Sequence, residues 1–271
     1  MPDPLMAARP SLWLIGGTQE SAQLARAIVQ AHLPCVVTVT TEQARSLYPS
    51  VPGLRIWVGT LTAEQMASFL KLQRVSAILD ASHPFAAAVS ELAIAAATTH
   101  HLPYLRYERQ SWNEQEPADS EVQHFETVDA LLASHVLQGE RVLLTMGYRR
   151  LQQFQPWQQA ATLFARILPS ATALEAALAA GFTPDRLIAI RPPIVAELET
   201  ALWQQWHIST VVTKASGVAG GEAVKRQVAA ALGVKLVIVD RPAIAYPHQT
   251  SNLQTALTFC KQVLALDARS Q

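Results

Sequence analysis

Two adjacent glycines between a short apolar run and a helical pattern constrain this chain more than any other sequence feature. The run at residues 12–15 carries no charge and does not alternate, which is typical of a strand buried on both faces of a parallel sheet. Apolar residues recur at helical spacing from Ser21 onward. The sequence therefore predicts a strand, a tight turn at Gly16 and Gly17, and a helix.

This turn suits a phosphate group. The first amides of a helix have no partner inside it, and the helix dipole makes that end partly positive. Glycine lets the backbone approach a ligand without an intervening side chain. The pattern is not G-x-G-x-x-G, because Ile15 and Glu20 stand where the first and third glycines would be, so a plain strand-to-helix turn remains an alternative. Its place after the first strand of an α/β chain favours phosphate binding.

The composition is that of a globular protein with a substantial core. Half of the 271 residues are hydrophobic and 15% are charged. The net charge is zero, with 21 basic and 21 acidic residues, which gives no sign of nucleic-acid binding. We expect neither a signal peptide nor a membrane span. Cys35 and Cys260 lack metal-ligand spacing, so we expect no metal site and a cytoplasmic location.

Strand patterns alternate with helical patterns in the first half of the chain. The expected strands cover residues 12–15, 35–40, 54–59, 76–80 and 104–107. This alternation predicts a parallel, doubly wound sheet. Ligands of such sheets bind at the carboxyl ends of the strands, where we expect Gly16, Thr40, Gly59 and Ser82 to converge.

A polar segment at residues 110–123 separates this half from the next and marks the domain boundary. We place an N-terminal dinucleotide-binding α/β domain at residues 10–112 and a C-terminal α/β substrate domain at residues 113–271. Further strands are expected at residues 122–125, 141–147, 162–168, 187–190, 210–213 and 235–239. The fold class is α/β, with two Rossmann-like domains of mostly parallel sheets flanked by helices and a ligand cleft between them.

The end of the second expected strand bears on cofactor choice. An NAD-binding unit carries an acid there for the ribose 2′-hydroxyl, whereas this chain has Thr40 and Thr41. The missing acid removes a repulsion against a 2′-phosphate, so NADP is favoured over NAD. Arg45 lies slightly further on, and a solvated helix residue is an equal alternative for it.

Polar and charged residues follow several other strands. Ser82 is a candidate helix cap and His83 a candidate donor, with a purely structural role as the alternative. Arg106 and Arg109 lie where the first domain ends, in what could equally be a solvated interdomain segment.

The second half of the chain contains a similar turn after an expected strand, with Lys214, Ser216 and Gly217. A lysine above free backbone amides suits a carboxylate or phosphate, although the order of residues excludes a P-loop. Arg149 and Arg241 add guanidinium groups at other strand ends. Each signal is weak alone, because strand ends are generally polar.

Four blocks of sequence together resemble the precorrin-6A reductase family of corrin biosynthesis, which includes the cobalt-precorrin-6A reductases. They are residues 15–20, residues 80–86, residues 103–109 with Trp112, and residues 213–217 with Lys225 and residues 241–242. The blocks D-A-[ST]-H-P-[YF] and T-K-x-S-G, in that order, are the specific ones. Ser82 and Phe85 stand where threonine and tyrosine are common, which argues against an obligatory acid at Phe85.

The resemblance implies an oxidoreductase that reduces one carbon–carbon double bond of precorrin-6A, or its cobalt form, to the 6B product in cobalamin biosynthesis. NADPH is the expected hydride donor, with NADH left open, and neighbouring enzymes of the corrin pathway are expected partners. The substrate is a tetrapyrrole with many carboxylates, which gives Arg and Lys a physical reason to line its site. The alternative is a non-catalytic NADP-binding sensor or interaction module.

We expect two sets of binding residues, and no particular side chain stands out as the proton donor. The expected cofactor-binding residues are Gly16, Gly17, Thr18, Glu20, Thr40, Gly59, Ser82 and His83. The expected substrate-binding residues are Arg106, Arg109, Arg149, Lys214, Ser216 and Arg241. The presence of cobalt in the substrate and the oligomeric state stay open.

Overall fold

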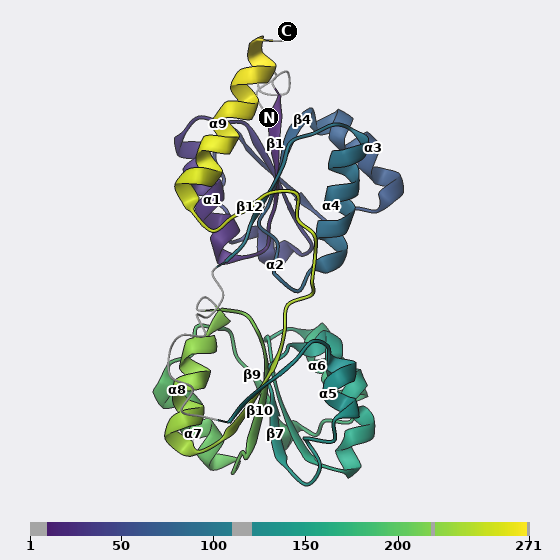
Figure 1. Cartoon of the computed structure of the whole chain (residues 1–271), viewed down its shortest axis with the longest axis vertical. Coiled ribbons are helices and arrows are strands. Elements are labelled where there is room, and N and C mark those ends of the chain that lie inside the picture. Colours follow the sequence, from purple (N-terminus) through teal and green to yellow (C-terminus); the bar gives the residue numbers. More distant parts are fainter. Residues whose placement is uncertain (1–9, 110–120, 218–219, 270–271) are drawn as a thin grey trace. The chain divides into compact units, whose positions relative to one another are not determined.

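The computed structural model describes residues 10–109, 121–217 and 220–269, which form two α/β units (Figure 1). The first unit comprises residues 1–109 and 243–271, and the second comprises residues 110–242. Each is built on a six-stranded sheet in which every strand pair is parallel. The expected fold class, α/β with parallel sheets flanked by helices, is confirmed. The expected cleft between the domains stays a prediction.

The sheet of the first unit has the strand order β12-β5-β4-β1-β2-β3. Its strands are β1 (Ser11–Ile15), β2 (Cys35–Val39), β3 (Leu54–Val58), β4 (Val75–Asp80), β5 (Tyr104–Tyr107) and β12 (Gln249–Thr250). Its helices are α1 (Gln19–Gln30), α2 (Glu42–Arg45), α3 (Ala63–Gln73), α4 (Ala87–Thr99) and α9 (Leu253–Arg269). Figure 1 shows α1 and α9 on one face and α3 and α4 on the other. The strand order reverses between β1 and β4, which is the switch point where ligands of such sheets bind.

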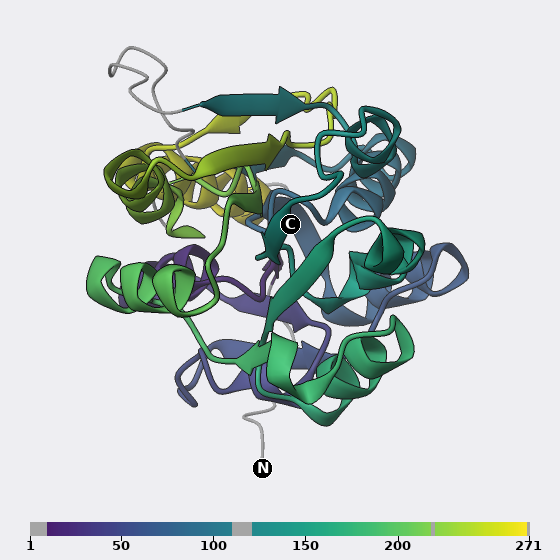
Figure 2. The same ribbon diagram turned by 90° about the horizontal axis from the view of Figure 1, so that it is seen from below.

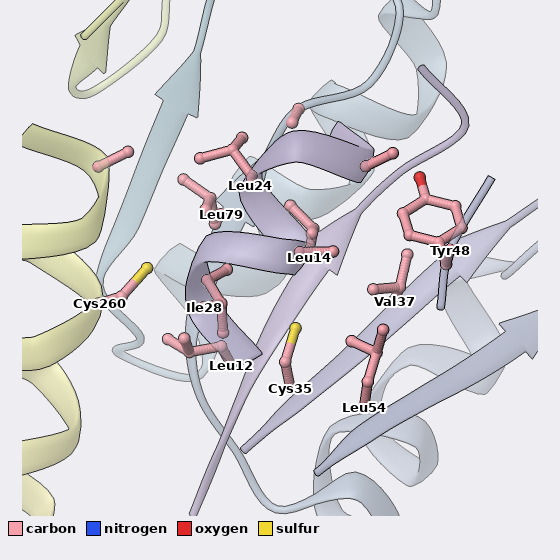
Figure 3. Close-up of a cluster of buried hydrophobic side chains, with 14 of the residues drawn as sticks. Leu12, Leu14, Leu24, Ile28, Cys35, Val37, Tyr48, Leu54, Leu79 and Cys260 are labelled. Atoms are coloured by element: carbon pink, nitrogen blue, oxygen red, sulfur yellow. The ribbon is translucent and has the colours of Figure 1, made fainter. Parts of the chain in front are cut away.

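Side chains of β1 pack into the hydrophobic clusters on both faces of the sheet. Leu12 and Leu14 join the cluster covered by α1 and α9, which Figure 3 shows. Trp13 points to the opposite cluster, where its ring meets Phe69 edge-on with 5.2 Å between centroids. Its indole Nε1 donates to Thr38 Oγ1 at 2.9 Å, so the one polar atom of this buried ring is satisfied. Burial on both faces explains why β1 is a continuous apolar run.

The sheet of the second unit has the order β6-β11-β10-β7-β8-β9, with its switch point between β10 and β7. Its strands are β6 (Val122–Phe125), β7 (Arg141–Leu144), β8 (Thr162–Ile167), β9 (Leu187–Ala189), β10 (Thr210–Lys214) and β11 (Lys235–Val239). Its helices are α5 (Val128–Ala133), α6 (Ala171–Ala179), α7 (Ala196–Gln205) and α8 (Glu222–Leu232), with 3-10 segments η2 (Tyr148–Gln159) and η3 (Pro184–Arg186). In Figure 2, β6 is the outermost teal arrow of this sheet.

The structure corrects the expected assignment of residues 113–271 to one domain, because the last elements belong to the first unit. β12 pairs with β5, and α9 buries Ala256 and Cys260 against the cluster around β1. The yellow helix in Figure 1 makes this return visible. Strand and helix patterns cannot tell which of two similar sheets a helix will cover, which is why the sequence misplaced it. The boundary predicted between residues 112 and 113, and Trp112, lie outside the described residues.

One edge strand of each sheet comes from the part of the sequence next to the other sheet, which we call the exchange of edge strands. β6 follows β5 in the sequence but lies at the edge of the second sheet. β12 follows β11 but lies at the edge of the first.

Among the described residues, no helix is both long and apolar enough to cross a membrane.

Candidate functional site at two switch points

The glycine turn after β1 uses both of its glycine amides internally. The Gly16 N–H donates to the Thr38 carbonyl at 2.9 Å, and the Gly17 N–H donates to the Tyr48 hydroxyl at 2.7 Å. A Cβ at Gly16 would lie 2.3 Å from the Tyr48 hydroxyl oxygen, so Gly16 is required by packing. Gly17 has a φ of +101° and nothing within 4 Å of an added Cβ, so the backbone there is open to a ligand.

Thr18 connects the start of α1 to the end of β4. Its hydroxyl accepts from the Ser21 N–H at 3.0 Å and donates to the Ala81 carbonyl at 3.1 Å. This cap satisfies one amide of the first turn. The amides of Gln19 and Glu20 have no acceptor within the helix, so they are the ones that remain for an anion.

Glu20 and Arg109 form one wall of a small pocket beside this turn. Arg109 Nε lies 3.0 Å from Glu20 Oε1, and Arg109 Nη2 donates to Glu20 Oε2 at 3.0 Å. The pocket is lined by Thr18, Glu20, Ala81, Ser82, Pro84, Tyr107 and Arg109. Arg109 offsets the negative charge that Glu20 brings to this end of the helix.

Asp80 organises the loop that follows β4. Both of its carboxylate oxygens accept two hydrogen bonds. The donors are the Ser82 N–H at 3.0 Å, Arg106 Nη1 at 2.9 Å, the Ser90 hydroxyl at 2.6 Å and the Tyr104 hydroxyl at 2.8 Å. Burial and the charge of Asp80 raise the pKa of Tyr104, so this phenol stays protonated and keeps donating. A buried carboxylate with this many donors holds the loop in one conformation.

Arg106 is fully buried, contrary to what direct substrate contact requires. Its guanidinium donates to Asp80, to the Ser82 hydroxyl at 2.9 Å, to the Ser82 carbonyl at 3.1 Å and to Glu108 at 2.9 Å. Its Cζ also lies 5.1 Å from the centre of the Tyr246 ring. These contacts argue against the substrate-binding role expected for Arg106. They assign it instead to fixing Ser82.

The remaining expected cofactor residues lie at the carboxyl ends of neighbouring strands. Thr40 is exposed after β2. A Cβ at Gly59 would lie 2.9 Å from the Trp57 ring, so packing alone explains this glycine. His83 is exposed after β4, and its Nδ1 accepts from the Phe85 N–H at 3.2 Å. The cofactor contacts of these three residues stay predictions.

In the second unit, cations gather at the switch point. Lys214 ends β10, while Arg149 and Arg150 lie in the segment that follows β7. Burial, and after it the charges of Arg150 and Arg149, lower the pKa of Lys214 to about 8. A lysine that is half-buried beside two cations is arranged for a negatively charged ligand.

Charged groups of α8 bond to the backbone of the described residues Gly217, Gly220 and Gly221. The Gly217 N–H donates to Glu222 Oε2 at 2.9 Å, and Glu222 Oε1 accepts from Arg226 Nη2 at 2.9 Å. Lys225 Nζ donates to the carbonyls of Gly220 and Gly221, each at 3.2 Å. The N-terminus of α8 and Gly217 are thereby tied to each other.

The other expected substrate residues divide between the units. Ser216 is buried, and Arg241 Nε donates to the Ala215 carbonyl at 2.8 Å. Arg149, Lys214, Ser216 and Arg241 therefore all belong to the carboxyl edge of the second sheet. Arg106 and Arg109 belong to the first unit.

Sequence reasoning missed residues that build these turns. Tyr48 lies just beyond α2, a four-residue helix with no periodic signal, so nothing in the sequence placed its hydroxyl beside Gly17. Tyr104 was read only as a strand residue. Glu222 opens α8, where an acid is ordinary for a helix start, and only the structure shows it holding Gly217.

Fold and site together define a two-unit Rossmann-type α/β protein with one polar and one cationic switch point. Residues 11–261 match the family model described as "Precorrin-6x reductase CbiJ/CobK". The chain is 45% identical to the cobalt-precorrin-6A reductase of Synechocystis sp., over 94% of this chain and 97% of that protein. It is 31% identical to the precorrin-6A reductase of Rhodococcus erythropolis, over 88% of this chain and 91% of that protein.

A solved structure agrees with these sequence comparisons. The protein named CobK precorrin-6A reductase superposes with a TM-score of 0.77 at 25% identity, covering 94% of this chain and 97% of the other. The chain belongs to the precorrin-6x reductase family. It is therefore an oxidoreductase enzyme that acts in cobalamin biosynthesis, which confirms the resemblance and argues against the sensor alternative.

Proposed function

We propose that this enzyme reduces one carbon–carbon double bond of cobalt-precorrin-6A with NADPH, giving cobalt-precorrin-6B. The cationic group of Lys214, Arg149 and Arg150 carries the proposal, because ammonium and guanidinium groups gathered at one strand end suit a substrate rich in carboxylates. The cobalt form is preferred because the Synechocystis relative at 45% identity and the Priestia megaterium relative at 32% identity are named for it.

The turn at Gly17 fits a nicotinamide dinucleotide. The open space beside Gly17 admits a pyrophosphate close to the backbone, and the amides of Gln19 and Glu20 are available to donate to it. Thr40 stands exposed where an acid would repel a 2′-phosphate. When bound, the cofactor would supply the hydride.

The protein's own residues bind and orient the two reactants. Asp80 and Arg106 hold Ser82 and the loop after β4, so this wall of the first site does not move when a ligand enters. In the second unit, Glu222 accepts from the Gly217 N–H, three residues after Lys214. Lys214 then offers an ammonium from a fixed backbone position, which favours an ordered carboxylate over a mobile one.

Purified protein, incubated without oxygen with NADPH and either cobalt-precorrin-6A or precorrin-6A, tests the proposal. We expect the absorbance of NADPH to fall only when the macrocycle is present, and faster with the cobalt form. NADH in place of NADPH should bind more weakly in calorimetric titration. Equal or reversed affinities would contradict the cofactor preference, and a faster reaction of the cobalt-free macrocycle would contradict the substrate.

Two further expectations accompany this proposal. Cys35 and Cys260 are free, buried thiols, which fits a reducing compartment such as the cytoplasm. Neighbouring enzymes of the corrin pathway are natural partners, since they make the substrate and consume the product. Copurification from a strain that makes cobalamin would test the latter.

A further inference from the structure

Tyr48 lies outside the residues that family or motif assigns to the site, yet its hydroxyl occupies the centre of the glycine turn. The ring belongs to the cluster around β1, beside Val37 and Leu54. Figure 3 shows the hydroxyl directed away from these two side chains. The residue is 7% exposed, and burial raises its pKa, so the hydroxyl keeps its proton.

The hydroxyl completes a directional chain of hydrogen bonds. It accepts from the Gly17 N–H at 2.7 Å and lies 2.6 Å from Ser21 Oγ. When Ser21 Oγ donates its single proton to the Thr18 carbonyl at 2.7 Å, the Tyr48 hydroxyl is the donor of the bond to Ser21 Oγ. In this arrangement the Gly17 N–H, the Tyr48 hydroxyl and Ser21 Oγ each have a hydrogen-bond partner.

The same contact explains Gly16. A Cβ there would lie 2.3 Å from the Tyr48 hydroxyl oxygen and 2.8 Å from Val37 Cγ1. The turn and the tyrosine are therefore fitted to each other. Because the Gly17 N–H already has an acceptor, it does not need a phosphate to stay paired, and the turn is formed before any ligand arrives.

Tyr48 also joins the turn to the segment after β2. Its N–H donates to the Arg45 carbonyl at 3.1 Å, at the end of α2, whose cap is Thr41. One side chain thus connects the loop expected at the pyrophosphate with the segment expected at the 2′-phosphate.

We propose that Tyr48 is a positioning residue that presets the Gly16–Gly17 turn for the dinucleotide. This rests on the proposed function, namely that the first unit binds NADPH. Removing the hydroxyl leaves the Gly17 N–H and Ser21 Oγ without their partner and lets the turn move. The cost should fall on cofactor binding rather than on the macrocycle or on the chemical step.

The test compares Tyr48→Phe with wild type and with Ser11→Ala. Ser11 is a matched control because it is fully buried and begins β1, the strand that leads into the Gly16–Gly17 turn. Its substitution also removes one buried hydroxyl, which bonds to the Gln73 carbonyl at 2.6 Å. We expect Tyr48→Phe to raise the Kd of both NADPH and NADH about 3- to 10-fold. KM for the macrocycle and kcat at saturating NADPH should stay near wild type.

Ser11→Ala should lose comparable thermal stability without changing either Kd. A double-mutant cycle adds a second readout, because Gly16→Ala should weaken NADPH binding less in the Tyr48→Phe background, where the closest clash is gone. Wild-type protein that binds neither dinucleotide would overturn the proposed function and this inference together. Wild-type binding with an unchanged Kd in Tyr48→Phe would overturn the inference alone.

Discussion

The two switch points share a topology but differ in charge. In the first unit, an arginine at the carboxyl end of β5 is buried and paired: Arg106 contacts Asp80 and Glu108. In the second, Lys214 is half-buried and the charges that shift its pKa most after burial are those of two arginines. Even the glycine amides differ, since a tyrosine hydroxyl holds Gly17 and the Glu222 carboxylate holds Gly217.

This difference indicates what each site is built to do. The first unit has its charges balanced before a ligand binds, so its charged groups stabilise the fold and its free backbone amides are left for the ligand. The second brings Lys214 close enough to Arg149 and Arg150 for their charges to lower its pKa, an arrangement that suits an anionic ligand. Substitutions of the charged side chains should therefore affect stability in the first unit, as for Arg106, and affinity in the second, as for Lys214.

The largest effect is expected for Arg106→Ala. Removing one partner of a buried ion pair leaves Asp80 uncompensated and should lower the free energy of unfolding by about 3–5 kcal/mol. Hydrogen exchange of the β1 and β4 amides would report this loss in the first unit. Arg149 is exposed, so Arg149→Ala should change the free energy of unfolding that hydrogen exchange reports for the second unit by less than about 0.5 kcal/mol. Similar losses in both variants would remove the contrast between the units.

The next largest effect concerns Gly17→Val. A β-branched side chain would fill the open space beside the turn, so NADPH affinity should fall at least about 100-fold, or roughly 2.7 kcal/mol. The positive φ also costs about 1–3 kcal/mol of stability. Gly53→Val shares the positive φ and the open surroundings, so it controls for strain. Equal NADPH affinity in the two folded variants would place the phosphates elsewhere.

Lys214→Ala should act on affinity alone. Losing an ammonium that pairs with a carboxylate or phosphate should cost about 1.5–3 kcal/mol, a roughly 10- to 100-fold rise in KM for the macrocycle or the cofactor. The melting temperature should not fall, because the substitution relieves repulsion from Arg149 and Arg150. Lys214→Arg should restore only part of the affinity. Wild-type kinetics for Lys214→Ala would move the site toward Arg241.

The smallest effect is a dependence of this affinity on pH. With a pKa of about 8, Lys214 loses its proton as the pH rises through 8, so KM should climb several-fold between pH 7 and 9. Over the same interval the unfolded lysine, with an ordinary pKa near 10.4, stays protonated, so deprotonation of the folded form adds stability as the pH rises. Lys214→Arg should remove the change in KM. A KM that is flat with pH in wild type would show that the lysine does not bind the anion as a cation.

The sequence predicted most of the fold because burial on both faces of a parallel strand leaves an apolar run. The limits of β11 agree with residues 235–239 as expected from the sequence. Less periodic segments were missed: η2 and α2 have no apolar stripe of useful length, and the two residues of β12 are too few to show a pattern.

For the candidate sites, the sequence located the residues along the chain but not their burial or their partners. Spacing along the chain located the carboxyl ends of the strands, where Gly17, Ser82 and Lys214 do lie. It could not separate a buried ion-paired arginine such as Arg106 from one open to ligands, since partners distant in sequence decide burial. For the same reason nothing in the sequence connected Tyr48 to Gly17, which lies 31 residues earlier.

The exchange of edge strands has a consequence for synthesis on the ribosome. The first sheet lacks β12 and α9 until residues 243 onward have emerged, which delays it by the roughly 7 to 27 s needed to translate residues 110–242 at about 5–20 residues per second. During this time the cluster around Leu12, Leu14 and Leu79 lacks the part of its cover that Ala256 and Cys260 provide. The second unit can bury its own core earlier. The part of the chain made first is thus completed last, and a nascent chain paused before residue 243 would be a natural client for chaperones that bind apolar surfaces.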